Sequence, residues 1–337
     1  MNATMSLEKT KHYPVMLKRL LSIISPQHGG SFIDCTFGGG GYSKAILNFP
    51  KTNVIGIDRD RIAEKNAKKL IEKFPKRFSF FIEKFSNLSK VIEKKTNIHA
   101  IMFDLGISSF QLSDKERGFS FNSELYLNME MGINKYSAYD VINNLDKKHL
   151  GNIIKILGEE KDGKKIANKI DIHRKIKPIK TSKELASIIN KVKKNYKAYK
   201  KNTATQTFQA IRIFVNQELT ELMHGLIEAT KILPKGGILV VVSFHSLEDR
   251  IVKNFFSNHS NLDRNPSRYL PIKENKFNFF KILSKKPLKP DASEIKENPR
   301  SRSAKLRYAI RNDNTFLYPK DFENKFSNYL NLEDIKI

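Results

Sequence analysis

A run of glycines, Gly38 to Gly41, follows a short apolar segment that contains an acid, Asp34. Glycine lets the backbone turn tightly and approach a ligand without an intervening side chain. A phosphate-binding P-loop would end in Gly-Lys followed by Ser or Thr, but this loop ends Gly41-Tyr42-Ser43-Lys44. The last glycine of the dinucleotide fingerprint is also missing. An acid beside such a loop favours a sulfonium nucleoside, which carries an ammonium group and no pyrophosphate. The alternative is an ordinary glycine-rich turn.

Two further acids end apolar runs. Asp58 follows the loop by about 20 residues, the spacing at which a carboxylate accepts hydrogen bonds from ribose hydroxyls. Asp60 next to it could simply cap a helix. Asp104 begins a second polar group that includes Ser108 and Gln111. In a doubly wound sheet the carboxyl ends of the strands form the ligand crevice, so we expect these side chains to lie there, although Ser108 could also be a helix cap.

A third polar group follows the most apolar run of the chain and contains His245 and Asp249. A lone histidine is more often structural than catalytic, but its place directly after a buried strand makes a role in catalysis equally plausible. We therefore include both residues among the candidate catalytic groups.

These loops need strands to position them, and the apolar runs predict one mostly parallel, doubly wound α/β sheet. The predicted strands are Ser31–Cys35, Asn53–Asp58, Phe78–Ile82, Ala100–Leu105 and Gly237–Phe244. Phe277–Leu283 and Ala304–Arg311 are predicted to form an antiparallel pair at the sheet edge.

The fourth and fifth strands are separated by about 130 residues, far more than one crossover helix requires. A helical pattern runs from Ser137 to Tyr199, and Thr181 to Glu184 reads as a capping box. We predict a discontinuous domain of residues 1–113 and 205–311, a helical insert of residues 114–204, and a C-terminal extension of residues 312–337 with no assigned role. One long helix, Thr205 to Ile232, should return the chain to the sheet.

The charge balance favours a polyanionic partner. Lysine and arginine number 61 against 35 acids, a formal charge of +26, which attracts nucleic acid. Basic residues gather at His173–Lys180, at Lys191–Lys201 with two interleaved tyrosines, and at Asn298–Ser303. These stretches could hold phosphates while the rings stack on bases, or they could be solvated helix faces.

Other classes of protein are disfavoured. The single cysteine, Cys35, allows no intrachain disulfide and no multi-cysteine metal site, which fits a reducing cytoplasm. No metal site is predicted. The N-terminus lacks an apolar signal segment, and Ile238–Val242 is too short to cross a bilayer, so secretion and membrane insertion are not expected.

Taken together, these segments resemble the MraW family of bacterial methyltransferases, which modify the N4 of a cytosine in 16S ribosomal RNA. The resemblance covers nearly the whole chain to about Arg311. Its motifs are the N-terminal His12–Leu17, the glycine loop, Asp104–Leu112, Arg117–Phe121, Gly158–Glu160, Ala204–Arg212, Ser243–Arg250 and Asn298–Arg307.

The resemblance implies a Rossmann-like class I methyltransferase fold and S-adenosylmethionine as cofactor. It implies cofactor contacts from Gly40, Gly41, Tyr42, Asp58, Phe85, Asp104 and Gln111. Phe85 is the one residue of this set that the pattern alone would assign to the core. The implied partner is 16S rRNA or the small ribosomal subunit. A monomer and a homodimer fit the sequence equally.

Methyl transfer to an exocyclic amine depends on positioning and on acceptors that hold the amine hydrogens. Asp104, Ser108, His245 and Asp249 are the candidate groups, in that order. The target base must be unpaired or flipped out to reach a cleft.

Two departures from the family pattern qualify this assignment. Tyr42 replaces a usual histidine but keeps a ring and a polar tip, while Asn128 and Glu130 replace an acid and a basic residue near the expected substrate cleft. The alternatives are a non-catalytic RNA-binding assembly factor, a methyltransferase acting on DNA or a small molecule, and, more remotely, a dehydrogenase.

Overall fold

The computed structural model describes residues 14–92, 97–193, 202–260 and 277–337. Its centre is a seven-stranded sheet with the order β3-β2-β1-β4-β5-β7-β6. The strands are β1 Gly30–Asp34, β2 Thr52–Asp58, β3 Phe78–Ile82, β4 Ile98–Asp104, β5 Ile238–Ser243, β6 Phe280–Lys281 and β7 Lys305–Arg311. The first five pair in parallel, and β7 runs antiparallel to both β5 and β6. The predicted doubly wound, mostly parallel sheet is thus confirmed.

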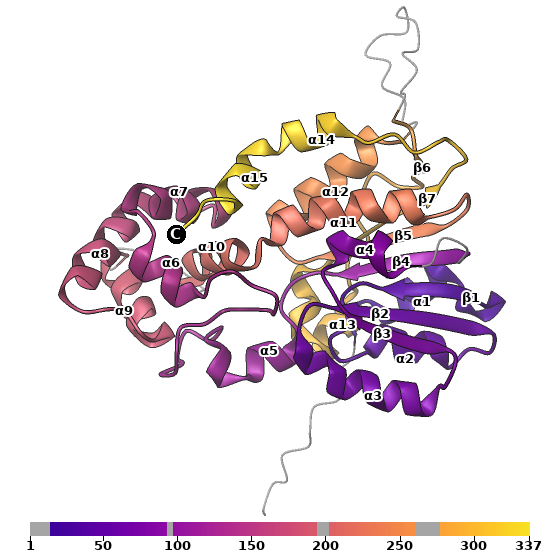
Figure 1. The fold of residues 1–337 in the computed structure, drawn as a ribbon, viewed down its shortest axis with the longest axis horizontal. Coiled ribbons are helices and arrows are strands. Elements are labelled where there is room, and N and C mark those ends of the chain that lie inside the picture. Colours follow the sequence, from indigo (N-terminus) through magenta and orange to yellow (C-terminus); the bar gives the residue numbers. More distant parts are fainter. Residues whose placement is uncertain (1–13, 93–96, 194–201, 261–276) are drawn as a thin grey trace, which may run out of the picture.

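Helices cover both faces of the sheet (Figure 1). One face packs against the helices α1 Leu17–Ile24, α2 Gly41–Leu47 and α3 Glu64–Lys73. The other packs against α4 Leu88–Val91, α11 Glu218–Ile232 and α12 Ser246–Asn258. Strand β5 is buried almost throughout because helices cover it on both sides, which explains its continuous Ile, Leu and Val content.

A helical unit lies beside the sheet (Figure 1). It contains α5 Ser109–Ser113, α6 Ala138–Asn144, α7 Lys147–Leu157, α8 Gly163–Ile176 and α9 Ser182–Val192, against which α10 Thr205–Asn216 packs. The predicted capping box at Thr181 and Glu184 is present. The helical prediction therefore holds as far as Val192, and residues 194–201, which carry much of the second basic stretch, lie outside the described residues.

The prediction of one helix from Thr205 to Ile232 is wrong. Gln217 has a left-handed backbone with φ of 50°, so α10 ends at Asn216 and α11 begins at Glu218. The apolar stripe continues across this break, so the sequence pattern does not reveal it.

The C-terminal extension folds back over the molecule. After α13 Ala292–Glu297 and β7, the chain forms α14 Lys320–Lys325 and α15 Ser327–Glu333. In Figure 1 these two helices (yellow) run from the sheet side toward the helical unit, and α15 packs on α10 and α11. The edge strand β6, Phe280–Lys281, is shorter than the predicted Phe277–Leu283. Residues 261–276, which precede this segment, lie outside the described residues. None of the described helices combines the length and apolarity that crossing a bilayer requires.

Candidate active site

A cavity of about 260 Å³ opens at the carboxyl ends of β1, β2 and β4. Its walls come from the glycine loop and the polar loops after these strands, together with the start of α11 and the segment around Arg300. Because parallel strands all end at this edge, polar residues that are far apart in sequence meet here.

The glycine loop forms one wall through Gly38, Gly39 and Gly41. A Cβ on Gly41 would lie 2.3 Å from Pro14, and one on Gly39 would lie 2.8 Å from the ring of Phe110. Gly40 does not line the cavity. A Cβ added to Gly40 would point toward the core and lie 2.7 Å from Phe37 and 3.1 Å from Leu70. The φ of 72° at Gly40 is what lets the loop turn into α2.

Tyr42 lines the cavity with a buried ring, and its hydroxyl donates a hydrogen bond to the carbonyl of Val15. Burial raises the pKa of this hydroxyl well above its ordinary value. Tyr42 therefore ties the N-terminal segment to the glycine loop, and its ring remains on the cavity wall.

Asp34 is a buried carboxylate at the end of β1, and Asp58, at the end of β2, is half-buried. Asp34 accepts from the hydroxyl of Ser43 at 2.7 Å. Asp58 accepts from the backbone N–H of Gly38 at 2.7 Å, and from that of Asp60 at 2.9 Å. Burial raises the pKa of each to about 6, against the effect of these hydrogen bonds. Asp58 thus holds the loop in place and still presents a face to the cavity.

Gln111 is bound at both ends of its amide. Its Oε1 accepts from the N–H of Ser108 at 3.0 Å, and its Nε2 donates to Asp60 at 2.8 Å. Asp60 also receives two bonds from Arg117, at 2.6 and 3.0 Å. The expectation that Asp60 could cap a helix is confirmed, because it accepts from the N–H of Ile62.

Asp104 and Glu221 are the two lining residues that each have a buried carboxylate oxygen without a hydrogen-bond partner among the described residues. In Asp104 this oxygen is Oδ1. Burial, with the charges of Asp34 and Glu248 adding to it, raises the pKa of Asp104 well above the usual value. The Asp104 side chain as a whole is half-buried and lines the cavity, so its carboxylate can accept a hydrogen bond from a ligand. Ser108 lines the same wall and caps α5 through a capping box.

Phe85, for which the residue pattern alone predicted a core position, is partly exposed to the cavity. Its ring meets the edge of Phe103 at 5.2 Å between centroids. The ring also packs directly on Gly225 of α11, where a Cβ would lie only 2.5 Å from it, so any larger residue at Gly225 would displace the ring. The ring is therefore fixed from behind and offers its remaining surface to a ligand.

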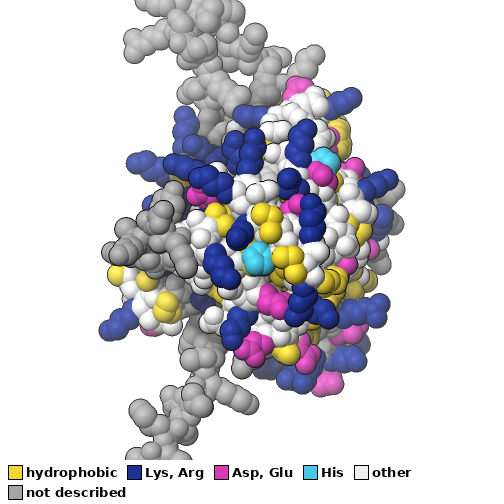
Figure 2. Space-filling view, turned by 90° about the vertical axis from the view of Figure 1, so that its left-hand side faces the viewer, with side chains coloured by type: hydrophobic (Ala, Val, Ile, Leu, Met, Phe, Trp, Pro, Cys, Tyr) yellow, Lys and Arg dark blue, Asp and Glu magenta, His cyan; other side chains and the backbone are white. Residues whose placement is uncertain are grey.

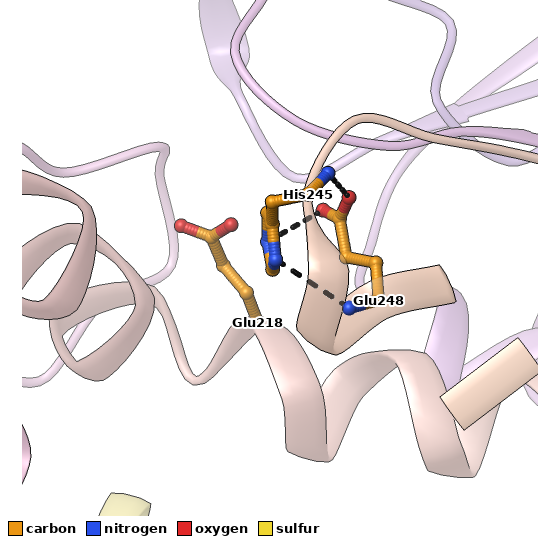
Figure 3. A group of neighbouring side chains, drawn as sticks. All are labelled: Glu218, His245 and Glu248. Carbon is orange, nitrogen blue, oxygen red and sulfur yellow. Dashed lines mark hydrogen bonds and ion pairs between the residues drawn. The ribbon is translucent and has the colours of Figure 1, made fainter. Parts of the chain in front are cut away.

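His245 stands behind the cavity wall between two carboxylates, Glu218 and Glu248 (Figure 3). Potential ligand atoms of the three residues lie within 4.8 Å of one another. The histidine Nδ1 accepts from the N–H of Glu248 at 3.4 Å, which places the proton of a neutral ring on Nε2. Nε2 lies 3.1 Å from Oε1 of Glu248, an ion-pair distance without hydrogen-bond alignment.

The two glutamates line the cavity, whereas His245 itself does not. Glu218 is held by Arg212 through two bonds of 2.7 Å. Burial opposes ionisation of Glu248, but the His245 ring and backbone N–H groups hold its pKa below the usual value. Because Arg212 already occupies both oxygens of Glu218, we interpret the group as a charge network rather than a metal centre.

Asp249 lies outside the cavity, contrary to its place among the candidates. Its carboxylate contacts Lys305 and Arg307 of β7, each at 2.8 Å. Burial opposes ionisation, yet these cations hold the pKa of Asp249 below its usual value. It links α12 to the sheet, and its neighbour Glu248 faces the cavity instead.

Sequence reasoning missed Glu218, Glu248 and Pro14. Glu218 sits at a helix break that no local signal marks. Glu248 belongs to the polar group after β5, but the sequence pattern favoured its neighbour Asp249. The basic segment after Asn298 was expected to contact phosphate, and Asn298 and Arg300 do lie at the cavity.

The departures at Asn128 and Glu130 have a structural explanation. The side-chain oxygen of Asn128 accepts from the N–H of Glu130 at 2.6 Å, a bond that asparagine and aspartate make alike. The carbonyl of Glu130, not its side chain, accepts from Arg117 at 3.1 Å. Neither contact depends on the residue types that were replaced.

Comparison with known sequences identifies the family. Residues 9–312 match the MraW methylase family. The chain belongs to this family. One relative of this MraW methylase chain is a protein of Ehrlichia canis named ribosomal RNA small subunit methyltransferase H. The two sequences are 44% identical over 303 residues, which cover 89% of this chain and 99% of the relative. A protein of Nitrobacter hamburgensis with the same name is 42% identical over 309 residues, covering 91% and 92%.

The residues present fit a sulfonium nucleoside. Carboxylates line the cavity, the glycine loop lets a ligand approach the backbone, and the ring of Phe85 offers an apolar surface. The orphaned oxygen of Asp104 supplies an acceptor that no described protein group uses. A negatively lined pocket suits a ligand with sulfonium and ammonium charges better than one with phosphates.

Proposed function

We propose that this chain transfers the methyl group of S-adenosylmethionine to the N4 of a cytosine in the 16S RNA of the small ribosomal subunit. The membership of the MraW methylase family and the names of its relatives support the reaction class and the RNA. The single structural observation that carries the proposal is the half-buried carboxylate of Asp104 on the cavity wall, whose Oδ1 has no hydrogen-bond partner among the described residues.

In this proposal the cofactor lies along the glycine loop, with Asp58 accepting from its ribose and Phe85 against its base. Gly41, Tyr42 and Gln111 form the surrounding wall. Gly40 contributes through the turn that it allows. When bound, S-adenosylmethionine supplies an electrophilic methyl group on a positively charged sulfur. The protein has to hold that methyl in line with the attacking nitrogen, because displacement depends on alignment.

Asp104 orients the acceptor. The lone pair of the cytosine amine is delocalised into its ring, so an acceptor that binds an N–H group helps to localise it. The nitrogen forms the bond to the methyl carbon as the methyl-sulfur bond breaks, and the nitrogen then loses a proton to Asp104. The raised pKa of Asp104 suits this task, since a carboxylate with high proton affinity is the stronger base.

Ser108 and His245 are proposed as positioning residues. Ser108 fixes the turn that follows Asp104 by capping α5. His245 caps α12 and lies between Glu218 and Glu248, the two glutamates that line the cavity. The contact of Asp249 with β7 makes its part in catalysis indirect.

The predicted insert of residues 114–204, which contains α6 to α9, is proposed to grip the RNA around the target base. Figure 2 shows lysine and arginine side chains distributed over the face on this side of the molecule. Exposed lysines on α7 and α8 include Lys147, Lys148, Lys155, Lys164 and Lys175. Phosphate contacts from such residues position a nucleic acid without reading its sequence. We place this activity in the cytoplasm, where ribosomal subunits are assembled.

The test is transfer of a labelled methyl group from S-adenosylmethionine into small-subunit RNA, followed by nucleoside analysis. The proposal expects label in N4-methylcytidine. Label in another base would refute the cytosine assignment, and label only in DNA or in a small molecule would refute the RNA assignment. RNA binding without cofactor binding and without methyl transfer would favour a non-catalytic assembly factor.

A further inference from the structure

The C-terminal extension reaches the start of α11, beside the cavity. Residues after 312 lie beyond the part of the chain that matches the family. In the structure they form α14 and α15, and Phe322 and Phe326 are buried. Phe322 meets Phe255 of α12 at 4.9 Å between ring centroids. The extension is thus anchored on the helices that carry the cavity wall.

Glu333, at the end of α15, caps a helix that lies more than a hundred residues earlier in the chain. Its carboxylate accepts from the N–H groups of Leu219 at 3.2 Å and Thr220 at 2.8 Å, and from the hydroxyl of Thr220 at 2.5 Å. Leu219 and Thr220 are the second and third residues of α11, the positions whose N–H groups an N-cap side chain normally binds.

The residue at the N-cap position, Gln217, does not perform this task. It has a left-handed backbone and makes no side-chain cap. Its amide instead donates to the backbone carbonyl of Glu333 at 3.2 Å. The break between α10 and α11 is therefore stabilised by Glu333, a residue of α15 that is only 3% exposed.

The first residue after this break is Glu218, whose side chain lines the cavity. Arg212 on α10 grips it from one side of the break, and Glu333 fixes the first turn of α11 from the other. A change in the angle between the two helices would move Glu218 relative to His245 and Glu248. Displacements of about 1 Å in a site can change rates by about a hundredfold.

We propose that Glu333 is a positioning residue for methyl transfer, which acts by capping α11 and so holding Glu218 in the cavity wall beside Glu248. This proposal rests on the proposed function. It assigns a role to a segment that lies outside the family match, and it makes the C-terminal extension part of the site.

The test is a double-mutant cycle on the full-length protein with Glu333→Ala and Glu218→Gln, measured as the rate of methyl transfer at saturating cofactor. If Glu333 acts through Glu218, Glu333→Ala lowers the rate by about tenfold or more, and the double variant is no slower than Glu218→Gln alone. Cofactor affinity, measured by calorimetry, should change by less than about twofold, because the cofactor lies along the glycine loop.

A matched control separates positioning from stability. Phe322→Leu weakens the packing of the same extension on Phe255 of α12 and leaves the carboxylate of Glu333 in place, so it should lower the melting temperature while leaving the rate unchanged. Should Glu333→Ala not fold, Glu333→Leu, which fills the same buried space without an acceptor oxygen, takes its place in the cycle. Additive losses, an unchanged rate in the Glu333 variant, or an equal loss in Phe322→Leu would overturn the proposal. A wild-type protein that is inactive on RNA would instead refute the proposed function.

Discussion

At the scale of single residues, the carboxylates of the cavity differ in what already satisfies them. Asp58 and Asp60 accept several protein hydrogen bonds, whereas Oδ1 of Asp104 accepts none among the described residues. Asp58 and Asp60 therefore shape the site, while Asp104 retains an oxygen for the substrate. This difference is invisible in the sequence, where each acid simply ends an apolar run.

Replacing Asp104 by asparagine should lower the rate of methyl transfer by about a hundredfold or more, because an amide cannot take the proton of the amine. The measurement is the single-turnover rate at saturating cofactor. Asp291→Asn, at the exposed N-cap of α13, is the control and should leave the rate unchanged. A rate within about threefold of wild type in Asp104→Asn would remove that residue from the mechanism.

Cofactor affinity should depend on pH. Burial raises the pKa of Asp34 and Asp58 to about 6. A bound cation favours the ionised carboxylates and lowers these pKa values, so binding releases protons near pH 6. Affinity should therefore rise between about pH 5 and pH 7. Calorimetry in buffers of different ionisation enthalpy measures the released protons; no release, or affinity that falls as the pH rises, would contradict this assignment.

At the scale of elements, the sequence predicts the strands and the loops after them, because each loop is contiguous and follows its own apolar run. It does not predict relations that depend on tertiary contacts. The helix break at Gln217 lies inside an unbroken apolar stripe. The hydrogen bonds from Arg212 of α10 to Glu218 of α11 cross this break. On α12, consecutive residues point about 100° apart, so Glu248 faces the cavity while Asp249 faces β7.

The pair of Arg117 and Asp60 joins the helical unit to the end of β2. Replacing Arg117 by methionine leaves Asp60 buried with only part of its partners, which should lower the free energy of unfolding by about 3 kcal/mol. The control is Arg19→Met, whose partner Asp291 is exposed, with an expected loss of about 0–1 kcal/mol. Urea denaturation compares the two, and equal losses would show that the buried pair is not a special link.

At the scale of the whole molecule, the charge and the fold class follow from composition and periodicity, whereas the docking of the C-terminal extension does not. Its helices are short and carry no motif that names their partner. Only the structure shows that Phe322 enters the aromatic cluster of α12 and that Glu333 reaches α11. The sequence left this extension without a role for that reason.

The salt dependence of RNA binding should follow the lysines of the helical unit. Replacing Lys155, Lys164 and Lys177 by glutamine should weaken RNA binding and reduce the slope of log K against log salt by about 0.7–0.9 for each phosphate that the protein no longer neutralises. Lys65, Lys68 and Lys69 are exposed on α3, which packs on a face of the sheet and not in the helical unit, so replacing these three lysines by glutamine is the control. Equal effects of both sets would indicate that net charge alone governs binding.

The central claim is that the carboxyl edge of this sheet binds S-adenosylmethionine through the loop that Asp58 holds. Calorimetric titration of the wild type and of Asp58→Ala with S-adenosylmethionine tests it most directly. The account predicts saturable binding to one site in the wild type and an affinity at least about tenfold lower in the variant, because charge-assisted hydrogen bonds are removed. Undiminished affinity in Asp58→Ala, or no binding to the wild type, would contradict it.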